Sequence, residues 1–247
     1  MKHPAIKKII LNAITFIGSA FKIGVFVPFV LLINTVSAQQ NDTLLKKLST
    51  LRDSYINEIK SFSFKPSLAP PVLVLDNPRS FGNYDDEKNV LHTCDWNTLP
   101  AGARQVFEEL AKNLNSRITA EQFFEISVHK WIFIHELGHW WRACQHVTAD
   151  PYENEKAANR IDAAYWNEHD PQFYQLMLSV FNDIVNHSPS PVPPGLDKAR
   201  YLNDNYQKLP GGAAYTWYQS IMIVEVSKEQ PFETFGQAIQ NAGKPLK

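Results

Sequence analysis

The pentapeptide His135-Glu136-Leu137-Gly138-His139 constrains this chain more than any other feature. It has the form H-E-x-x-H and lies in an apolar, aromatic stretch without proline, which predicts a helix. Residues four positions apart lie one above the other on a helix, so His135 and His139 can offer two imidazole nitrogens to one tetrahedral Zn²⁺. Glu136 beside them can take a proton from a metal-bound water. The alternative is a core helix with two hydrogen-bonded histidines and a solvated glutamate, but a glutamate buried beside two buried histidines is costly without a metal.

The first 38 residues have the pattern of an export signal. Lysines precede a long apolar stretch that is most apolar over residues 23–33, and small residues ending at Ala38 fit a signal-peptidase site before Gln39. Lys22 and Pro28 interrupt the stretch, which is unusual for a membrane span. We therefore predict that residues 1–38 are a cleaved signal peptide and that the mature protein is exported to the periplasm or secreted. A retained N-terminal membrane anchor is the alternative.

Residues 39–247 are long enough for a single domain with a sizeable core. Residues 1–38 hold four of the 24 basic residues and none of the 25 acidic residues, so the mature net charge is −5. This mildly acidic balance argues against a nucleic-acid partner. The two cysteines, Cys94 and Cys144, could form a disulfide in an exported protein or remain two buried thiols.

The spacing of apolar residues predicts an α+β fold that is mostly helical and contains one small sheet of three strands. A proline-rich loop is expected at 188–195, where a helix cannot continue. The expected helices cover 41–60, 101–113, 120–145, 150–166, 173–185, 196–209, 213–227 and 232–239, and the expected strands cover 72–75, 81–84 and 89–93, the last two as a hairpin.

Flanking residues of the pentapeptide have structural interpretations as well. Trp131, Trp140 and Trp141 are expected in the core, because aromatic residues on a long helix usually pack there. Glycine within a helix costs about 1 kcal/mol relative to alanine, so we expect Gly138 to permit close approach to the underlying sheet. His129 lies off the face that carries His135.

A catalytic zinc site of this kind needs a third protein ligand, with the fourth position left to water. One known extension is H-E-x-x-H-x-x-G-x-x-H. Here Arg142 stands at its glycine position and Gln145 at its last histidine position, while His146 is one residue out of register. This extension is therefore excluded.

A glutamate from the next helix is the other route to a third ligand. Asp150 suits the N-cap of that helix, and Glu153 then has the spacing of a capping box. Glu155 lies further inside the helix and shares a face with Asn159 and Asp162. We assign Glu155 as the ligand, with Glu153 as the alternative. Asn159, one turn later, could hold the free N–H of a ligand histidine and so fix its tautomer.

These motifs resemble the gluzincin metallopeptidases. The pentapeptide, Glu155-Lys156-Ala157-Ala158-Asn159 and Ala163-Ala164 are most similar to the small members of that group, the minigluzincins and ImmA/IrrE-type peptidases. The resemblance covers about residues 71–167. It implies a zincin-like fold, in which a small sheet with an edge strand along the substrate cleft precedes two metal-bearing helices.

The resemblance also implies an activity. This is hydrolysis of a peptide or protein substrate by zinc-activated water, with Glu136 as general base. Members similar to ImmA are usually cytosolic, whereas this chain has an export pattern, so no regulatory role is carried over. Two alternatives are a zinc-dependent binding or sensing module and an inactive relative. The presence of Glu136 favours catalysis over both.

In that family a tyrosine or histidine downstream of the zinc glutamate stabilises the oxyanion. Tyr206 is favoured for this role, because the polar residues 203–205 before it suggest a surface facing a cleft. The other candidates are Tyr201, Tyr215 and His187.

Overall fold

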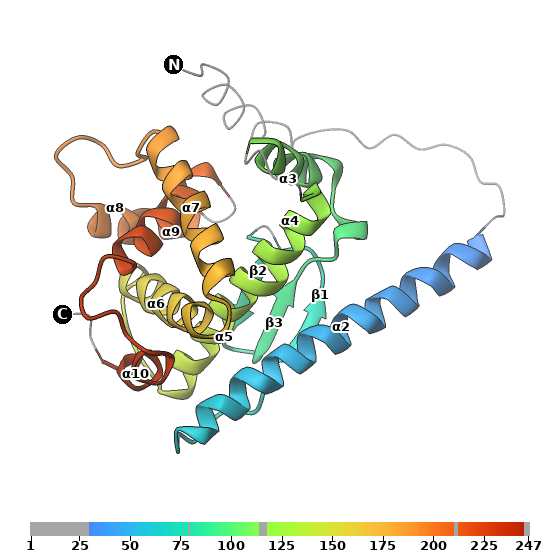
Figure 1. The fold of residues 1–247 in the computed structure, drawn as a ribbon, viewed down its shortest axis with the longest axis horizontal. Helices are drawn as coiled ribbons and strands as arrows, with labels where there is room; N and C mark the ends of the chain where they lie inside the picture. Colours follow the sequence, from blue (N-terminus) through green and yellow to red (C-terminus); the bar gives the residue numbers. More distant parts are fainter. Residues whose placement is uncertain (1–29, 79, 114–117, 210–211, 245–247) are drawn as a thin grey trace.

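The computed structural model describes residues 30–78, 80–113, 118–209 and 212–244, which form mostly helices and one small three-stranded sheet at one side of the helices (Figure 1). The predicted class, α+β and mostly helical, is confirmed. In chain order the elements are α2 (Val30–Ser61), β1 (Val72–Leu75), β2 (Gly82–Asp85), β3 (Val90–Thr93), η1 (Trp96–Thr98), α3 (Ala101–Asn113), α4 (Ala120–Ile126), η2 (Ser127–Ile132), α5 (Phe133–Cys144), α6 (Pro151–His169), α7 (Pro171–His187), α8 (Lys198–Asn205), η3 (Tyr206–Lys208), α9 (Ala213–Val226) and α10 (Phe235–Asn241).

The sheet has the strand order β1-β3-β2. Strand β1 runs parallel to β3, with Val72 opposite Val90, and β2 runs antiparallel to β3, with Gly82 opposite Thr93. The β2–β3 pair is the predicted hairpin, and the backbone N–H of Lys88 donates to the Asp85 side chain at its turn. As a consequence β1 and β2 are the two edge strands, and β2 is an edge strand that packs against α5.

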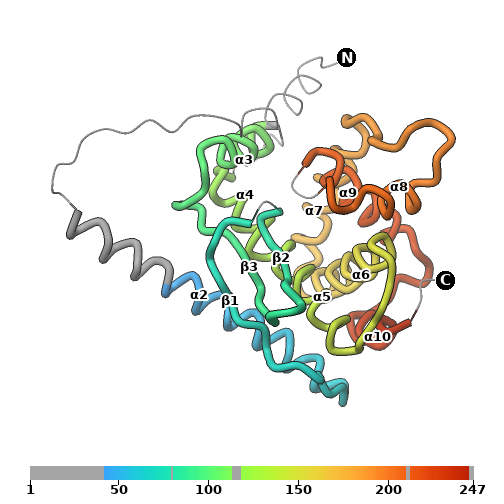
Figure 2. The backbone as a smooth tube through the Cα atoms, turned by 180° about the vertical axis from the view of Figure 1, so that it is seen from behind, coloured from blue at the N-terminus to red at the C-terminus, as the bar shows by residue number. Residues whose placement is uncertain are grey.

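Helix α2 begins at Val30, earlier than the predicted start at residue 41, and passes through the expected cleavage site near Ala38. Residues 1–29, which hold most of the predicted export signal, lie outside the described residues. In the part of the chain that the structure describes, no helix combines the length and apolar character needed to cross a membrane. Leu48, Tyr55 and Ile59 are buried, which places the C-terminal half of α2 against the core (Figure 2).

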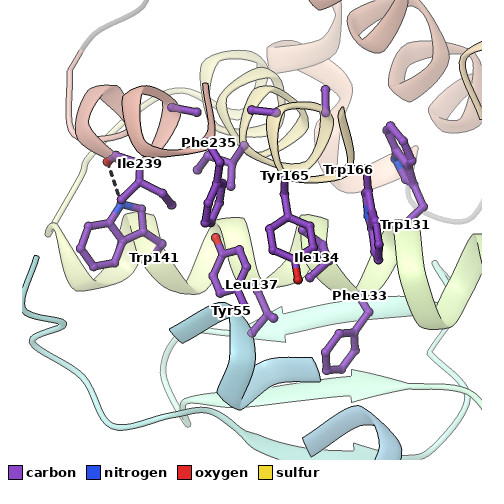
Figure 3. Close-up of a cluster of buried hydrophobic side chains, with 14 of the residues drawn as sticks. Tyr55, Trp131, Phe133, Ile134, Leu137, Trp141, Tyr165, Trp166, Phe235 and Ile239 are labelled. Atoms are coloured by element: carbon purple, nitrogen blue, oxygen red, sulfur yellow. Dashed lines mark hydrogen bonds between the residues drawn. The ribbon is translucent and has the colours of Figure 1, made fainter. Parts of the chain in front are cut away.

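The predicted helix 120–145 is a continuous helical rod in three parts. The Thr119 side chain and Gln122 form a capping box at the start of α4, a π-helical segment, η2, follows, and α5 carries the H-E-x-x-H residues. Helix α5 is buried along most of its length between α6 on one side and the sheet with α2 on the other (Figure 3). Ile134 and Leu137 are fully buried in this cluster.

The three tryptophans of the rod, Trp131, Trp140 and Trp141, are buried, as predicted. The prediction that Gly138 packs closely against the sheet is wrong. A Cβ on Gly138 would lie 3.2 Å from Cα of Ala158, so the glycine permits close packing of α5 on α6 rather than on the sheet.

Cys94 and Cys144 are both buried and free. Of the two predicted alternatives, the buried thiols are therefore the one observed. Burial raises the pKa of Cys94 to about 12, which keeps this thiol protonated and unreactive at neutral pH. His129 is buried nearby and its Nε2 lies 2.8 Å from the carbonyl oxygen of Cys94, which accounts for a histidine away from the face of His135.

Candidate metal centre

His135 and His139 on α5 meet Glu155 on α6. The Nε2 atom of His135 lies 3.2 Å from Oε2 of Glu155, and the two histidine Nε2 atoms lie 3.1 Å apart. The third edge of the triangle, from His139 Nε2 to Glu155 Oε2, is 3.6 Å. Their position on successive turns of α5 and the close approach of α6 at Gly138 bring the three side chains together.

The N-terminus of α6 decides which glutamate reaches the histidines. Asp150 caps the helix by accepting from the backbone N–H of Glu153, and Pro151 occupies the first turn, as predicted. Glu155, two residues further along, is 1 % exposed and turns toward α5. Among the described residues, the cluster with metal-ligand geometry contains His135, His139 and Glu155, and Glu153 is not part of it.

The distances of this triangle fit a tetrahedral metal. Ligands about 2.0–2.2 Å from a zinc ion at tetrahedral angles lie about 3.3–3.6 Å from one another. The three observed edges, 3.1, 3.2 and 3.6 Å, scatter around that value. Two imidazoles and one carboxylate are also the chemical set that leaves one position open on a catalytic zinc. The residues present therefore fit such a metal.

The charges of the site are strongly coupled. Burial alone would raise the pKa of Glu155, but the adjacent His139 and His135 hold it well below its usual range. Burial alone would lower the pKa of His139, and the Glu155 carboxylate more than offsets this, so the net pKa is raised. The buried carboxylate is thus compensated by positive charge on the neighbouring His139, which is the role that a divalent cation would take over.

Glu136 lies against the edge strand β2. Its Oε2 accepts from the backbone N–H of Tyr84 at 2.8 Å, and the residue is 8 % exposed. Gly82 in the same strand allows this contact, because a Cβ there would lie 2.3 Å from Cγ2 of Ile132 and 3.2 Å from Cγ of Glu136. The strand therefore fixes the orientation of the Glu136 carboxylate beside the histidines.

Gln219 on α9 is a site residue that sequence reasoning missed. Its Nε2 donates to Oε2 of Glu155 at 2.6 Å, and its Oε1 accepts from Nδ2 of Asn159 at 2.7 Å. The hydrogen bonds of Asn159 thus go to Gln219, with a longer contact to Met222, rather than to a ligand histidine as predicted. Asn159 fixes the Gln219 amide so that its NH₂ group faces Glu155. No local pattern marks Gln219, because it lies 64 residues from Glu155.

Two of the four candidates for the oxyanion donor lie at the site, and two do not. Tyr206 is at the site, but its hydroxyl donates to Oε1 of Glu155, and burial together with that carboxylate raises its pKa. Tyr215 packs against Tyr206 with ring centroids 6.4 Å apart and lines the cavity next to Glu136. His187 is exposed and bonds a carbonyl of its own helix, and Tyr201 packs in the cluster around Leu202, so neither is at the site.

A cavity of about 190 Å³ adjoins His135 and Glu136. Its lining residues come mainly from α3, α4, η2, α5, α7 and α9. Figure 1 shows how these elements are arranged. Among its polar lining residues, Asn159 and Gln219 are hydrogen-bonded next to the metal-ligand cluster, and most of the wall is apolar. The apolar wall includes Val106, Phe107, Leu110, Phe123, Met177 and Val180.

Comparisons with protein-family models, with curated proteins and with solved structures find no match to this chain.

Proposed function

We propose that this chain is a zinc-dependent metallopeptidase with a zincin-like fold. The observation that carries the proposal is the convergence of His135, His139 and Glu155 within hydrogen-bond distance, next to a Glu136 that strand β2 holds in place. A carboxylate without a ligand role beside a three-ligand site is the arrangement that metal-assisted hydrolysis requires. The resemblance of the two motifs to gluzincins supports the same interpretation.

Zinc in such a site supplies Lewis acidity and a water molecule whose pKa is close to neutral. Glu136 takes the proton of the attacking water and later delivers it to the leaving amine of the cleaved peptide bond. The backbone N–H of Tyr84 holds Oε2 of Glu136, so Oε1 is the oxygen that is free to carry the proton.

The oxyanion that forms during attack needs a hydrogen-bond donor. We assign this role to Tyr215, because it lines the cavity beside Glu136. Burial, and with it the nearby Glu155 and Tyr206, raise the pKa of Tyr215, so its hydroxyl stays protonated and can donate. Tyr206 then serves as a positioning residue for Glu155. This exchanges the two tyrosines relative to the assignment made from sequence.

The substrate in this proposal is a peptide or protein, and export with the predicted signal would place the enzyme in the periplasm or outside the cell. The test is zinc content together with cleavage of casein and a broad peptide library by the wild type and Glu136→Gln. We expect both forms to bind one zinc and only the wild type to cleave. Bound zinc with no cleavage by the wild type would show a zinc-binding module without turnover. Absence of zinc from the purified wild type would show that the three residues do not form a zinc site.

A further inference from the structure

A second cavity lies at the C-terminal end of α5, where this helix meets the start of α6 and the residues after α10. Its volume is about 190 Å³, and most of its lining residues are polar or charged, which distinguishes it from the cavity beside Glu136. The wall consists of Arg142, residues 145–149, Glu153 and residues 243–244. Arg142, Gln145 and His146, the residues that exclude the longer histidine motif, are thus gathered around one polar cavity.

Arg142 has free hydrogen-bond donors in this wall. The residue is 3 % exposed, its Nε donates to Oδ1 of Asn154 at 2.8 Å, and its Nη1 donates to the carbonyl oxygen of Ala242. A guanidinium carries five N–H donors, so three are left over. Nη2 forms no hydrogen bond within the part of the chain that the structure describes, yet it is not sealed from solvent as an unpartnered core atom would be. The remaining donors therefore face the cavity.

The positive charge of Arg142 is incompletely compensated. Both of its hydrogen-bond partners are neutral oxygens, and burial lowers its pKa, which Glu153 offsets only in part. A buried charge without a paired counter-charge is costly. Lys244 on the same wall is exposed and adds a second positive charge, because its ammonium is bonded only to the neutral side chain of Asn241. An anion in the cavity would supply the missing counter-charge.

We propose that this cavity binds a small organic carboxylate, whose oxygens accept from the free N–H groups of Arg142. The planar guanidinium matches the two oxygens of a carboxylate. A protein cavity of about 150 Å³ is large enough to bind benzene, so this one has room for a carboxylate of about four to six carbon atoms. Glu153 lies in the same wall and repels a doubly charged phosphate more strongly than a singly charged carboxylate. The inference is independent of the proposed peptidase activity.

The test is calorimetry on the full chain with zinc bound, at pH 7 and low ionic strength, with butyrate, butyramide and inorganic phosphate as probes. Butyramide has nearly the same shape as butyrate but no charge, so it should bind at least about 10-fold more weakly, and phosphate should also bind more weakly than butyrate. A carboxylate could instead bind to the zinc ion. Glu155→Ala, which is expected to lose the metal, controls for this and should bind butyrate like the wild type.

Three variants place the binding at this cavity. Arg142→Gln should weaken butyrate binding by about 10–150-fold, the effect of a hydrogen bond to a charged group. Because Arg142 is buried, two variants at its rim provide a test that does not depend on removing a core side chain. Lys244→Gln should weaken butyrate binding and Glu153→Gln should strengthen it, each by about 2–5-fold, as expected for single charges near the surface. Melting temperatures check that each variant is folded.

Several results would overturn the inference. They are the absence of butyrate binding, equal binding of butyrate and butyramide, and tighter binding of phosphate than of butyrate. Loss of butyrate binding in Glu155→Ala would assign the carboxylate to the zinc ion instead. Butyrate binding that is unchanged in both Lys244→Gln and Glu153→Gln would place it elsewhere on the protein.

Discussion

Replacing Gln219 by leucine tests whether α9 is part of the metal centre. The substitution keeps the approximate size of the side chain but removes the donor to Oε2 of Glu155, now at 2.6 Å, and the partner of Asn159. A hydrogen bond to a charged group contributes about 1.5–3 kcal/mol. At about 1.4 kcal/mol per tenfold change, this corresponds to zinc binding weaker by about 10–150-fold, which agrees with the roughly 10–100-fold typical of residues that orient metal ligands.

The assay is a competition titration of metal-free protein with zinc and a chromophoric chelator at neutral pH. Gln240→Leu is the matched control, because Gln240 is exposed on α10, away from the metal ligands, and should bind zinc like the wild type. A zinc dissociation constant of Gln219→Leu within about twofold of the wild type would refute the positioning role of this residue.

Three other perturbations have defined outcomes. Asp162 is fully buried, and burial raises the pKa of its carboxyl well above the ordinary value, although the neighbouring Trp166 lowers it. The folded state keeps the carboxyl proton of Asp162 while the unfolded chain releases it above about pH 4, so the wild type loses stability as pH rises. Urea unfolding at pH 5 and pH 8 should therefore show that the free energy of unfolding of Asp162→Asn increases relative to the wild type at the higher pH. Gly138→Val should lower the free energy of unfolding by about 1–3 kcal/mol in the same assay, because its Cβ would lie 3.2 Å from Cα of Ala158 and the added methyl groups need further room. Burial lowers the pKa of His139, but Glu155 more than offsets this, so the net pKa is raised above the ordinary value of about 6.5. Protons therefore begin to compete with zinc for His139 at a pH above about 6.5, and zinc that is retained after dialysis at pH 8 should be lost progressively toward pH 5.

Features set by local sequence were predictable. The spacing of His135 and His139 places both on one helix face, and the cap at Asp150 fixes where α6 begins, which separates Glu155 from Glu153. Strands β1 and β3 consist mainly of β-forming residues between turn residues, whereas β2 (Gly82–Asp85) was expected from its place across a turn from β3, and the prolines of 188–195 mark a loop. Each of these depends on residues a few positions apart in the chain.

Features that depend on the approach of distant elements were not predictable. Gln219 reaches Glu155 only because α9 packs on α6, and Gly138 faces Ala158 instead of the sheet because α6 covers that side of α5. The π-helical segment η2 was not predicted, because its apolar residues follow a spacing close to that of an ordinary α-helix. The cavity beside Glu136 arises from the assembly of several helices, for which the sequence carries no local signal.

The most direct test of the central claim is the zinc content of the purified full chain in three forms, the wild type, Glu155→Ala and Glu153→Ala. The wild type and Glu153→Ala should each hold one zinc ion per chain, because Glu153 lies outside the ligand cluster. Glu155→Ala should lose the metal, because it leaves two histidines without their third ligand. Zinc retained in Glu155→Ala and lost in Glu153→Ala would contradict the account.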